Sequence, residues 1–166
     1  MAVKANSTVK DLGDLNGKAV ATTQGTTSDK YIKMGAKGEQ VKVTNVYGKD
    51  HSDSFAMVAS GRAAAFVMDD NILAGLIAKS SKPKDFKIVG PVLSSEPYGI
   101  MLPKGDAAYK AIADKVVTGM WKNGQMAALY KKWFQSPIPP KNLNLNMPMS
   151  TSYHKLKAAP NDKGIN

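Results

Sequence analysis

The chain has 166 residues, of which 43% are hydrophobic, and this suffices for one domain with a buried core and an appendage. No apolar run approaches the ~20 residues of a membrane helix, and we expect no signal peptide within this sequence. The absence of cysteine excludes disulfides, thiolate metal sites and a cysteine nucleophile. The net charge is +10, but the basic residues are scattered lysines with a single arginine, Arg62. Nucleic-acid binding usually requires clustered basic residues and arginine forks, so we expect no nucleic-acid partner.

The first elements lie in residues 1 to 31. The chain opens on what could be the tail of a strand, and residues 8–15 predict a single helical turn that buries two leucines. Ala19-Val20-Ala21 is typical of a short buried strand, Gln24-Gly25 of a turn, and the hydroxyl residues that follow of a helix N-terminus. Free backbone N–H groups and the helix dipole make such a site suitable for an anion.

Four hydroxyl residues gather at this turn, and they have two possible roles. They could hold a carboxylate or a phosphate together with the backbone, or they could simply cap the helix, which is the more common role of serine and threonine. The residues are Thr23, Thr26, Thr27 and Ser28.

Strands and helices then alternate. Gly35 and Gly38 predict the end of the first helix, and we expect strands at 40–47, 64–68 and 86–89 and helices beginning at His51 and Asp69. This alternation indicates an α/β fold with a mostly parallel sheet and right-handed crossovers. Ligands of such sheets bind beyond the carboxyl ends of the strands. The hydroxyl cluster, His51 and Asp69 are therefore expected at one edge.

The pattern changes after Glu96. Residues 97–102 predict a strand that leaves the sheet, 106–123 an amphipathic helix and 125–134 a shorter, strongly apolar helix. From Ser136 several prolines favour an extended chain, interrupted by one possible turn at 153–157.

The chemistry that these residues allow is limited. His51 is flanked by Asp50, Asp53 and Ser54, but sequence adjacency is not triad geometry, and a G-x-S-x-G elbow is absent. A metal site from histidine and aspartate here has no recognised ligand spacing, and Asp69 could serve as a helix cap. Helix-end donors, an imidazole and a carboxylate together suit a zwitterionic amino acid.

Several stretches carry a family resemblance. The runs 14–28, 49–55 and 60–70 resemble the periplasmic glutamate/aspartate-binding proteins, the solute receptors of amino-acid ABC importers. The similarity continues through Glu96-Pro-Tyr-Gly99, Lys131-Lys-Trp-Phe134 and the tail segments 137–144 and 160–163. The resemblance implies a periplasmic-binding-protein-like lobe: a mostly parallel five-stranded sheet with helices on both faces, C-terminal helices and an extended tail. It also implies a protein that is not an enzyme and needs no cofactor or metal.

The resemblance further implies residue roles and partners. Asp69 would accept the ligand's α-ammonium, Thr27 with Thr23, Thr26 and Ser28 would surround its carboxylate, and His51 would meet an acidic side chain. The partners would be L-glutamate or L-aspartate and the membrane permease of an ABC importer, and the location would be the periplasm.

The resemblance also implies a partial receptor. Residues 5–97 would form the second, ligand-binding lobe, 98–135 a crossover strand and helices that belong to the first lobe, and 136–166 an extended tail. The first lobe would supply an arginine fork that Arg62 does not replace. Because each lost charged hydrogen bond removes ~2 kcal/mol, we expect weak binding.

Two alternatives stay open at this point. The same fold could carry a dehydratase or a hydrolase, because fold does not fix function. The chain could instead be a ligand-incompetent fragment that self-associates through Trp121, Trp133 and Phe134.

Overall fold

The computed structural model describes residues 1–34, 41–139 and 141–163. The chain divides into two compact units, Met1–Leu93 and Ser94–Asn166. The assignment of 98–135 to another lobe of a larger receptor stays a prediction. Among the described residues, every helix is too short or too polar to cross a membrane.

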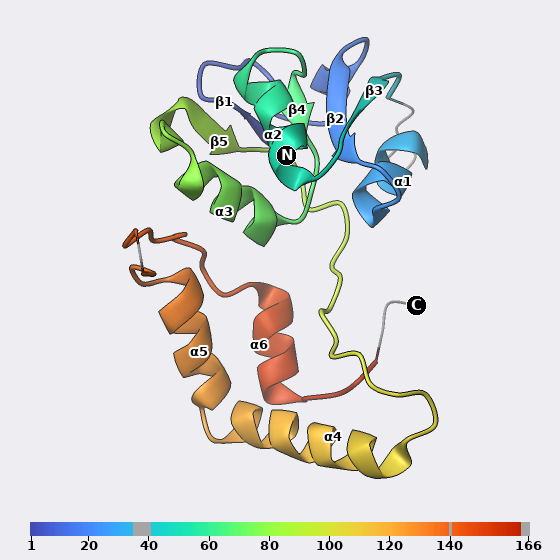
Figure 1. Cartoon of the computed structure of the whole chain (residues 1–166), viewed down its shortest axis with the longest axis vertical. Coiled ribbons are helices and arrows are strands. Elements are labelled where there is room, and N and C mark those ends of the chain that lie inside the picture. The colour runs from blue at the N-terminus through green and yellow to red at the C-terminus, as the bar shows by residue number, and fades with distance from the viewer. Residues whose placement is uncertain (35–40, 140, 164–166) are drawn as a thin grey trace. The chain divides into compact units, whose positions relative to one another are not determined.

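The first unit is built on a five-stranded sheet in the order β3-β2-β4-β1-β5 (Figure 1). β2 pairs in parallel with β3 and β4, whereas β1 runs antiparallel to both of its neighbours, β4 and β5. Four strands therefore share one direction, which confirms the prediction of a mostly parallel sheet. The strands are β1 (Ala2–Lys4), β2 (Ala19–Thr23), β3 (Thr44–Gly48), β4 (Ala65–Phe66) and β5 (Phe86–Ile88).

In the described part of the first unit, three helices and two short 3-10 turns surround the sheet. They are α1 (Thr27–Met34), α2 (His51–Ala59), α3 (Asp70–Lys79), η1 (Gly13–Leu15) and η3 (Pro83–Asp85). Alternate side chains of the buried strands point to opposite faces. Val20 packs with Leu15 and with Ile32 of α1 on one face. Ala21 packs with Phe55 of α2 and Leu73 of α3 on the other. Helices on both faces were predicted, and the two apolar cores confirm this.

One strand differs from the prediction. The strand expected at 40–47 begins at Thr44, although Val41 and Val43 still pack partly against the core. The strand expected at the start of the chain is present as β1, which lies inside the sheet between β4 and β5. The helix end predicted at Gly35 and Gly38 lies outside the described residues.

The second unit consists of α4 (Ala107–Lys122), α5 (Gln125–Phe134) and α6 (Thr151–Ala158). Asp106 caps α4 by accepting the Tyr109 N–H at 2.8 Å, and Ser150 caps α6 by accepting the Tyr153 N–H at 3.0 Å. The serine cap starts α6 two residues before the predicted turn at 153–157, so the tail is less extended than expected.

Aromatic rings hold the second unit together. The ring of Tyr153 on α6 lies 5.0 Å from that of Trp121 on α4 and 4.9 Å from that of Tyr130 on α5. Tyr130 in turn lies 4.7 Å from Phe134. Such tilted and edge-on pairs add to the stabilisation that burial provides.

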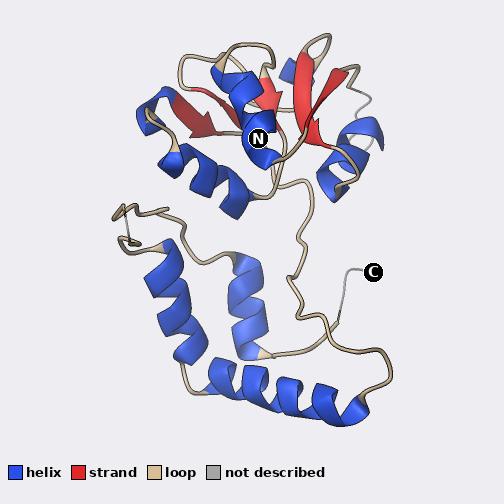
Figure 2. Cartoon of the chain, viewed as in Figure 1, coloured by secondary structure: helices blue, strands red, loops and turns tan. Residues whose placement is uncertain are grey.

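The strand predicted at 97–102 is wrong. Residues 91–102 have no regular secondary structure, as the continuous loop before α4 in Figure 2 shows. Ile100 and Met101 are exposed, the latter to 95%. A strand is stable only when a neighbouring strand takes up its backbone hydrogen bonds, and the described residues provide none for this segment.

Candidate functional site

The carboxyl ends of three strands meet at one edge of the sheet. β2 is parallel to β3 on one side and to β4 on the other. The segments that follow these strands therefore emerge at the same edge, where ligands of open α/β sheets bind. They carry the hydroxyl residues 23–28, His51 and Asp69.

The turn between β2 and α1 is closed by Thr26. Its hydroxyl donates to the Thr23 carbonyl at 2.7 Å and accepts the Asp29 N–H at 3.3 Å, which is an N-cap interaction. Gly25 has φ of 77°, a left-handed conformation that glycine adopts without strain. The capping role predicted for the hydroxyl cluster is thus confirmed at Thr26, whose side chain is already engaged by the protein.

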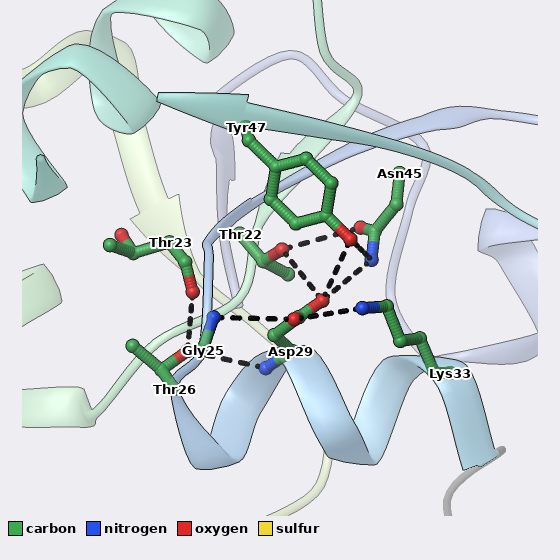
Figure 3. Close-up of polar contacts among 8 residues, drawn as sticks. All are labelled: Thr22, Thr23, Gly25, Thr26, Asp29, Lys33, Asn45 and Tyr47. Atoms are coloured by element: carbon green, nitrogen blue, oxygen red, sulfur yellow. Dashed lines mark hydrogen bonds and ion pairs between the residues drawn. The ribbon is translucent and has the colours of Figure 1, made fainter. Parts of the chain in front are cut away.

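A buried carboxylate, Asp29, anchors this turn to the sheet (Figure 3). Only 4% of the residue is exposed. Its oxygens accept hydrogen bonds from Asn45 Nδ2 at 3.0 Å, from the Tyr47 hydroxyl at 3.1 Å and from Lys33 Nζ at 3.0 Å. Longer bonds of 3.4 Å come from the Thr22 hydroxyl and the Gly25 N–H.

These bonds determine the charge state of Asp29. Burial alone would raise the pKa of its carboxyl group. Hydrogen bonds from Lys33, Tyr47 and the Gly25 N–H outweigh burial and hold this pKa below its usual value. Asp29 is therefore ionised at neutral pH and fixes β2, β3 and α1 relative to one another.

Thr23, the last residue of β2, reaches across to α2. Its Oγ1 lies 2.8 Å from His51 Nδ1 and 3.3 Å from Ser54 Oγ. Ser54 is fully buried and also contacts two backbone carbonyls, at 3.0 Å to Asp50 and 3.2 Å to Thr22. The structure thus brings together two predicted site residues, Thr23 and His51, whose sequence positions differ by 28.

The carboxylates of the two aspartates near His51 accept hydrogen bonds from backbone N–H groups. Asp50 accepts the Asp53 N–H at 2.8 Å, and Asp53 accepts the Lys49 N–H at 3.0 Å. The first of these bonds caps α2, and the second holds the residue that precedes the cap. The Nδ1 atom of His51 faces the threonine hydroxyl instead of a carboxylate, which is not the arrangement of a hydrolytic Ser/His/Asp triad.

The remaining predicted residues lie as follows. Asp69 occupies the N-cap position of α3, but its side chain makes no capping hydrogen bond. Thr27 is the first residue of α1 and is exposed, whereas Ser28 is buried. Arg62 is exposed in the connection that precedes β4, at the opposite end of this strand from Asp69.

Sequence reasoning missed the residues that support the site. Asp29 stands three residues after a capping threonine, a spacing typical of a capping box. Asn45 and Tyr47 are two residues apart in β3 and therefore lie on the same face of the strand. These two signals could have indicated the network, whereas no local signal links Ser54 to Thr23. Within the described ranges, no three histidine, aspartate or glutamate residues gather as metal ligands.

Comparison with known proteins gives a consistent result. The chain is 47% identical over 160 residues to an L-glutamate/L-aspartate-binding protein of Pseudomonas aeruginosa, covering 96% of this chain and 53% of the relative. It is 42% identical over 166 residues to a glutamate/aspartate import solute-binding protein of Salmonella typhimurium, covering 100% and 55%. No family model matches the chain.

Comparison with solved structures also finds a binding protein. An ancestral arginine-binding protein bound to glutamine matches with a TM-score of 0.65 and 35% identity, covering 80% of this chain and 57% of that structure. The relatives are solute-binding proteins, in agreement with the interpretation of a binding protein and not an enzyme. The chain spans about half the length of the two relatives named above. It is a homologue, over essentially its whole length, of about half of a glutamate/aspartate solute-binding protein.

Proposed function

We propose that the chain is the ligand-binding lobe of a receptor for an acidic L-amino acid, glutamate or aspartate. The observation that carries the proposal is the 2.8 Å contact between Thr23 and His51 at the carboxyl edge of the sheet. It occurs in a chain 47% identical to a protein named for L-glutamate and L-aspartate binding. The hydroxyl holds the imidazole in place, and an imidazole that carries both ring protons can donate to a carboxylate oxygen.

The roles of the edge residues follow from their chemistry. Asp69 would accept the ligand's α-ammonium group, and Thr27 and Ser28 at the start of α1 would surround its α-carboxylate, where the helix dipole favours an anion. Thr23, at the end of β2, would contribute by holding the His51 ring. His51 would meet the acidic side chain. Thr26 would contribute chiefly by holding the turn, because its hydroxyl is engaged by Thr23 and Asp29.

In the intact receptor this lobe would close on a second lobe around the ligand and then deliver it to the membrane permease of an ABC importer. The location would be the periplasm. Without groups from a second lobe, affinity should be lower by about 2 kcal/mol for each missing charged hydrogen bond. We therefore expect weak binding, in the millimolar range.

The test is an NMR titration of the isotope-labelled chain with L-glutamate and L-aspartate. We expect saturable shifts confined to the segments around Thr23, His51 and Asp69. L-Glutamine, which has the same shape but a neutral side chain, is the matched control ligand and should shift the His51 signals less. A folded chain whose signals do not move at millimolar L-glutamate would contradict binding by this lobe alone.

A second candidate property is self-association, which the exposed apolar side chains of the second unit favour. α4 buries no residue, and its Tyr109, Ile112 and Val116 are each about half exposed or more, at 49%, 61% and 55%. Of the three aromatic residues predicted for this role, Trp121 and Phe134 pack inside the second unit. Trp133, at 44% exposed, is the one most available for contact with a second copy.

A further inference from the structure

The buried hydroxyl of Ser54 determines how protons are distributed around His51. A serine hydroxyl has one proton to donate. Ser54 Oγ lies within hydrogen-bond distance of two carbonyl oxygens, those of Asp50 at 3.0 Å and Thr22 at 3.2 Å. Carbonyl oxygens only accept. The Ser54 proton therefore belongs to one of these carbonyls, and the Ser54 oxygen can offer only a lone pair to Thr23.

The neighbouring backbone keeps Ser54 in this position. A Cβ atom added to Gly48 would contact the Ser54 backbone nitrogen and would lie 2.6 Å from Ser54 Oγ. Ser54 is fully buried, so no solvent can replace its carbonyl partners. Its hydroxyl is thus confined to the orientation that the two carbonyls favour.

The direction of the next hydrogen bond follows. In the 3.3 Å contact between Thr23 and Ser54, Thr23 must be the donor, because the Ser54 proton is already used. The Thr23 oxygen then accepts from His51 Nδ1, 2.8 Å away. We infer that Ser54 is a positioning residue for the ligand site: through Thr23 it places the His51 proton on Nδ1 and leaves Nε2 to face a ligand.

This inference gives His51 a defined chemistry. Nε2 has no hydrogen-bond partner among the described residues. In the neutral ring it is an acceptor, suited to an N–H or O–H donor of the ligand. A carboxylate ligand could accept a hydrogen bond from Nε2 only when the ring carries both protons. This consequence rests on the proposed function, whereas the proton position itself does not.

The charged groups around His51 are consistent with this assignment. On its own helix, the carboxylates of Asp50 and Asp53 accept backbone N–H groups. The β2 end contributes the neutral Thr23, and Asp69 follows β4 at the same edge. The side-chain hydrogen bond of the His51 ring within the described chain is therefore to a neutral hydroxyl.

Nitrogen-15 NMR of the histidine ring tests the inference on the full chain without any ligand. In alkaline buffer, where an ordinary imidazole is neutral, we expect a protonated Nδ1 and an unprotonated Nε2 at His51. A His154→Gln background removes the other histidine signal. Ser54→Ala should release the Thr23 proton to Nδ1 and reverse the pattern, moving the ring proton to Nε2. Thr23→Ser, which keeps the hydroxyl, should retain the original pattern.

Ser60→Ala is the matched control. Ser60 is an exposed serine at the end of the same helix, and its hydroxyl donates to the Ala56 and Met57 carbonyls at 2.9 and 3.2 Å. Its loss should leave the His51 pattern unchanged. A proton on Nε2 in the unsubstituted chain, or no change in a folded Ser54→Ala chain, would overturn the inference. If Ser54→Ala does not fold, the pattern of the unsubstituted chain still decides.

The result is independent of the proposed function. If L-glutamate causes no shifts but His51 carries its proton on Nδ1, the receptor proposal fails and the positioning role stands. If L-glutamate binds while the ring proton is on Nε2, the receptor proposal stands and the role of Ser54 is wrong.

Discussion

At the residue scale, Asp29 connects two strands and a helix through one ionised group. Its partners come from β2, β3, the turn and α1. Buried carboxylates are stable only when hydrogen bonds replace water. Because Asp29 meets this condition with several donors, the geometry of the turn that carries Thr23 and Thr26 depends on its charge.

We predict that Asp29→Asn lowers the free energy of unfolding of the first unit by about 1–3 kcal/mol, because the donors that surround this side chain lose an ionised acceptor. In the unsubstituted chain the pKa of Asp29 is lowered in the folded state, so the unfolded chain binds a proton more readily. The stabilisation is complete above the usual aspartate pKa and is lost as pH falls through the lowered one.

Urea unfolding followed by the β2 and β3 amide signals, repeated from neutral to acidic pH, measures both effects. The variant should lose stability less steeply with acid than the unsubstituted chain. Asp85→Asn, at an exposed position of the same unit, is the control and should leave the acid dependence nearly unchanged. Equal acid dependence in all three chains would contradict the role of Asp29.

Two glycines of the first unit should respond oppositely to alanine. At Gly48 an added methyl group would collide with the backbone of Ser54, and overpacking of this kind costs about 1–3 kcal/mol. Gly75 lies within α3 with no atom within 4 Å of an added Cβ. Alanine there should stabilise the helix by about 0.5–1 kcal/mol.

Thermal unfolding of the two variants checks this contrast. Gly48→Ala should also change the His51 ring signals, because it displaces the start of α2, whereas Gly75→Ala should not. An unchanged melting temperature for Gly48→Ala would show that α2 can shift at little cost.

The sequence allowed the site to be predicted only where the signals are local. A threonine before a helical run predicts a cap, and Thr26 is one. The position of His51 after the second strand followed from the topology of alternating elements. Asp29 and Ser54 were missed because their roles depend on partners up to 32 residues away, and such pairings have no sequence period.

At the element scale, α6 is attached to the second unit through the ring of Tyr153. The residue is 8% exposed, and its hydroxyl is buried with no hydrogen-bond partner in the described part of the chain. An orphaned polar group of this kind costs roughly 1–3 kcal/mol. The ring contacts with Trp121 and Tyr130 therefore stabilise α6 despite the hydroxyl.

We predict that Tyr153→Phe stabilises the second unit by about 1 kcal/mol, because it removes the orphaned group and keeps the ring. Tyr153→Ala should destabilise it by roughly 3–5 kcal/mol, as for other large aromatic truncations. Trp121 fluorescence during urea unfolding, in a Trp133→Phe background, reports both changes. A clear loss of stability in Tyr153→Phe would mean that the hydroxyl has a partner in solution.

Elements could be predicted where their apolar period is long or their caps are clear. α4 has both, and α5 follows the Asn123-Gly124 turn with a strongly apolar face; the ranges of both helices agree with the prediction within one residue at each end. β1 has only three residues, and its place inside the sheet depends on β4 and β5. Residues 97–102 have strand-like composition, but a strand also needs a neighbour. Sequence composition cannot supply this information.

At the scale of the whole molecule, charge and apolar surface act against each other. Residues 94–166 contain ten lysines and four acidic residues, a formal net charge of +6. The same residues include the exposed apolar side chains of α4. Like charges repel across a distance that shrinks as salt is added, from a Debye length of ~30 Å at 0.01 M to ~3 Å at 1 M. Apolar contact persists at high salt.

We therefore predict that any self-association increases with ionic strength. Light scattering should give a mass near that of the monomer at low salt and a higher mean mass at high salt. The double variant Ile112→Gln/Val116→Gln should reduce this increase, because it removes the apolar face of α4 without adding charge. The matched control is Ile88→Gln/Val92→Gln in the first unit, where both side chains are also exposed. A mass that falls as salt is added would show that ion pairs hold the copies together, and a decrease confined to the control variant would place the contact on the first unit.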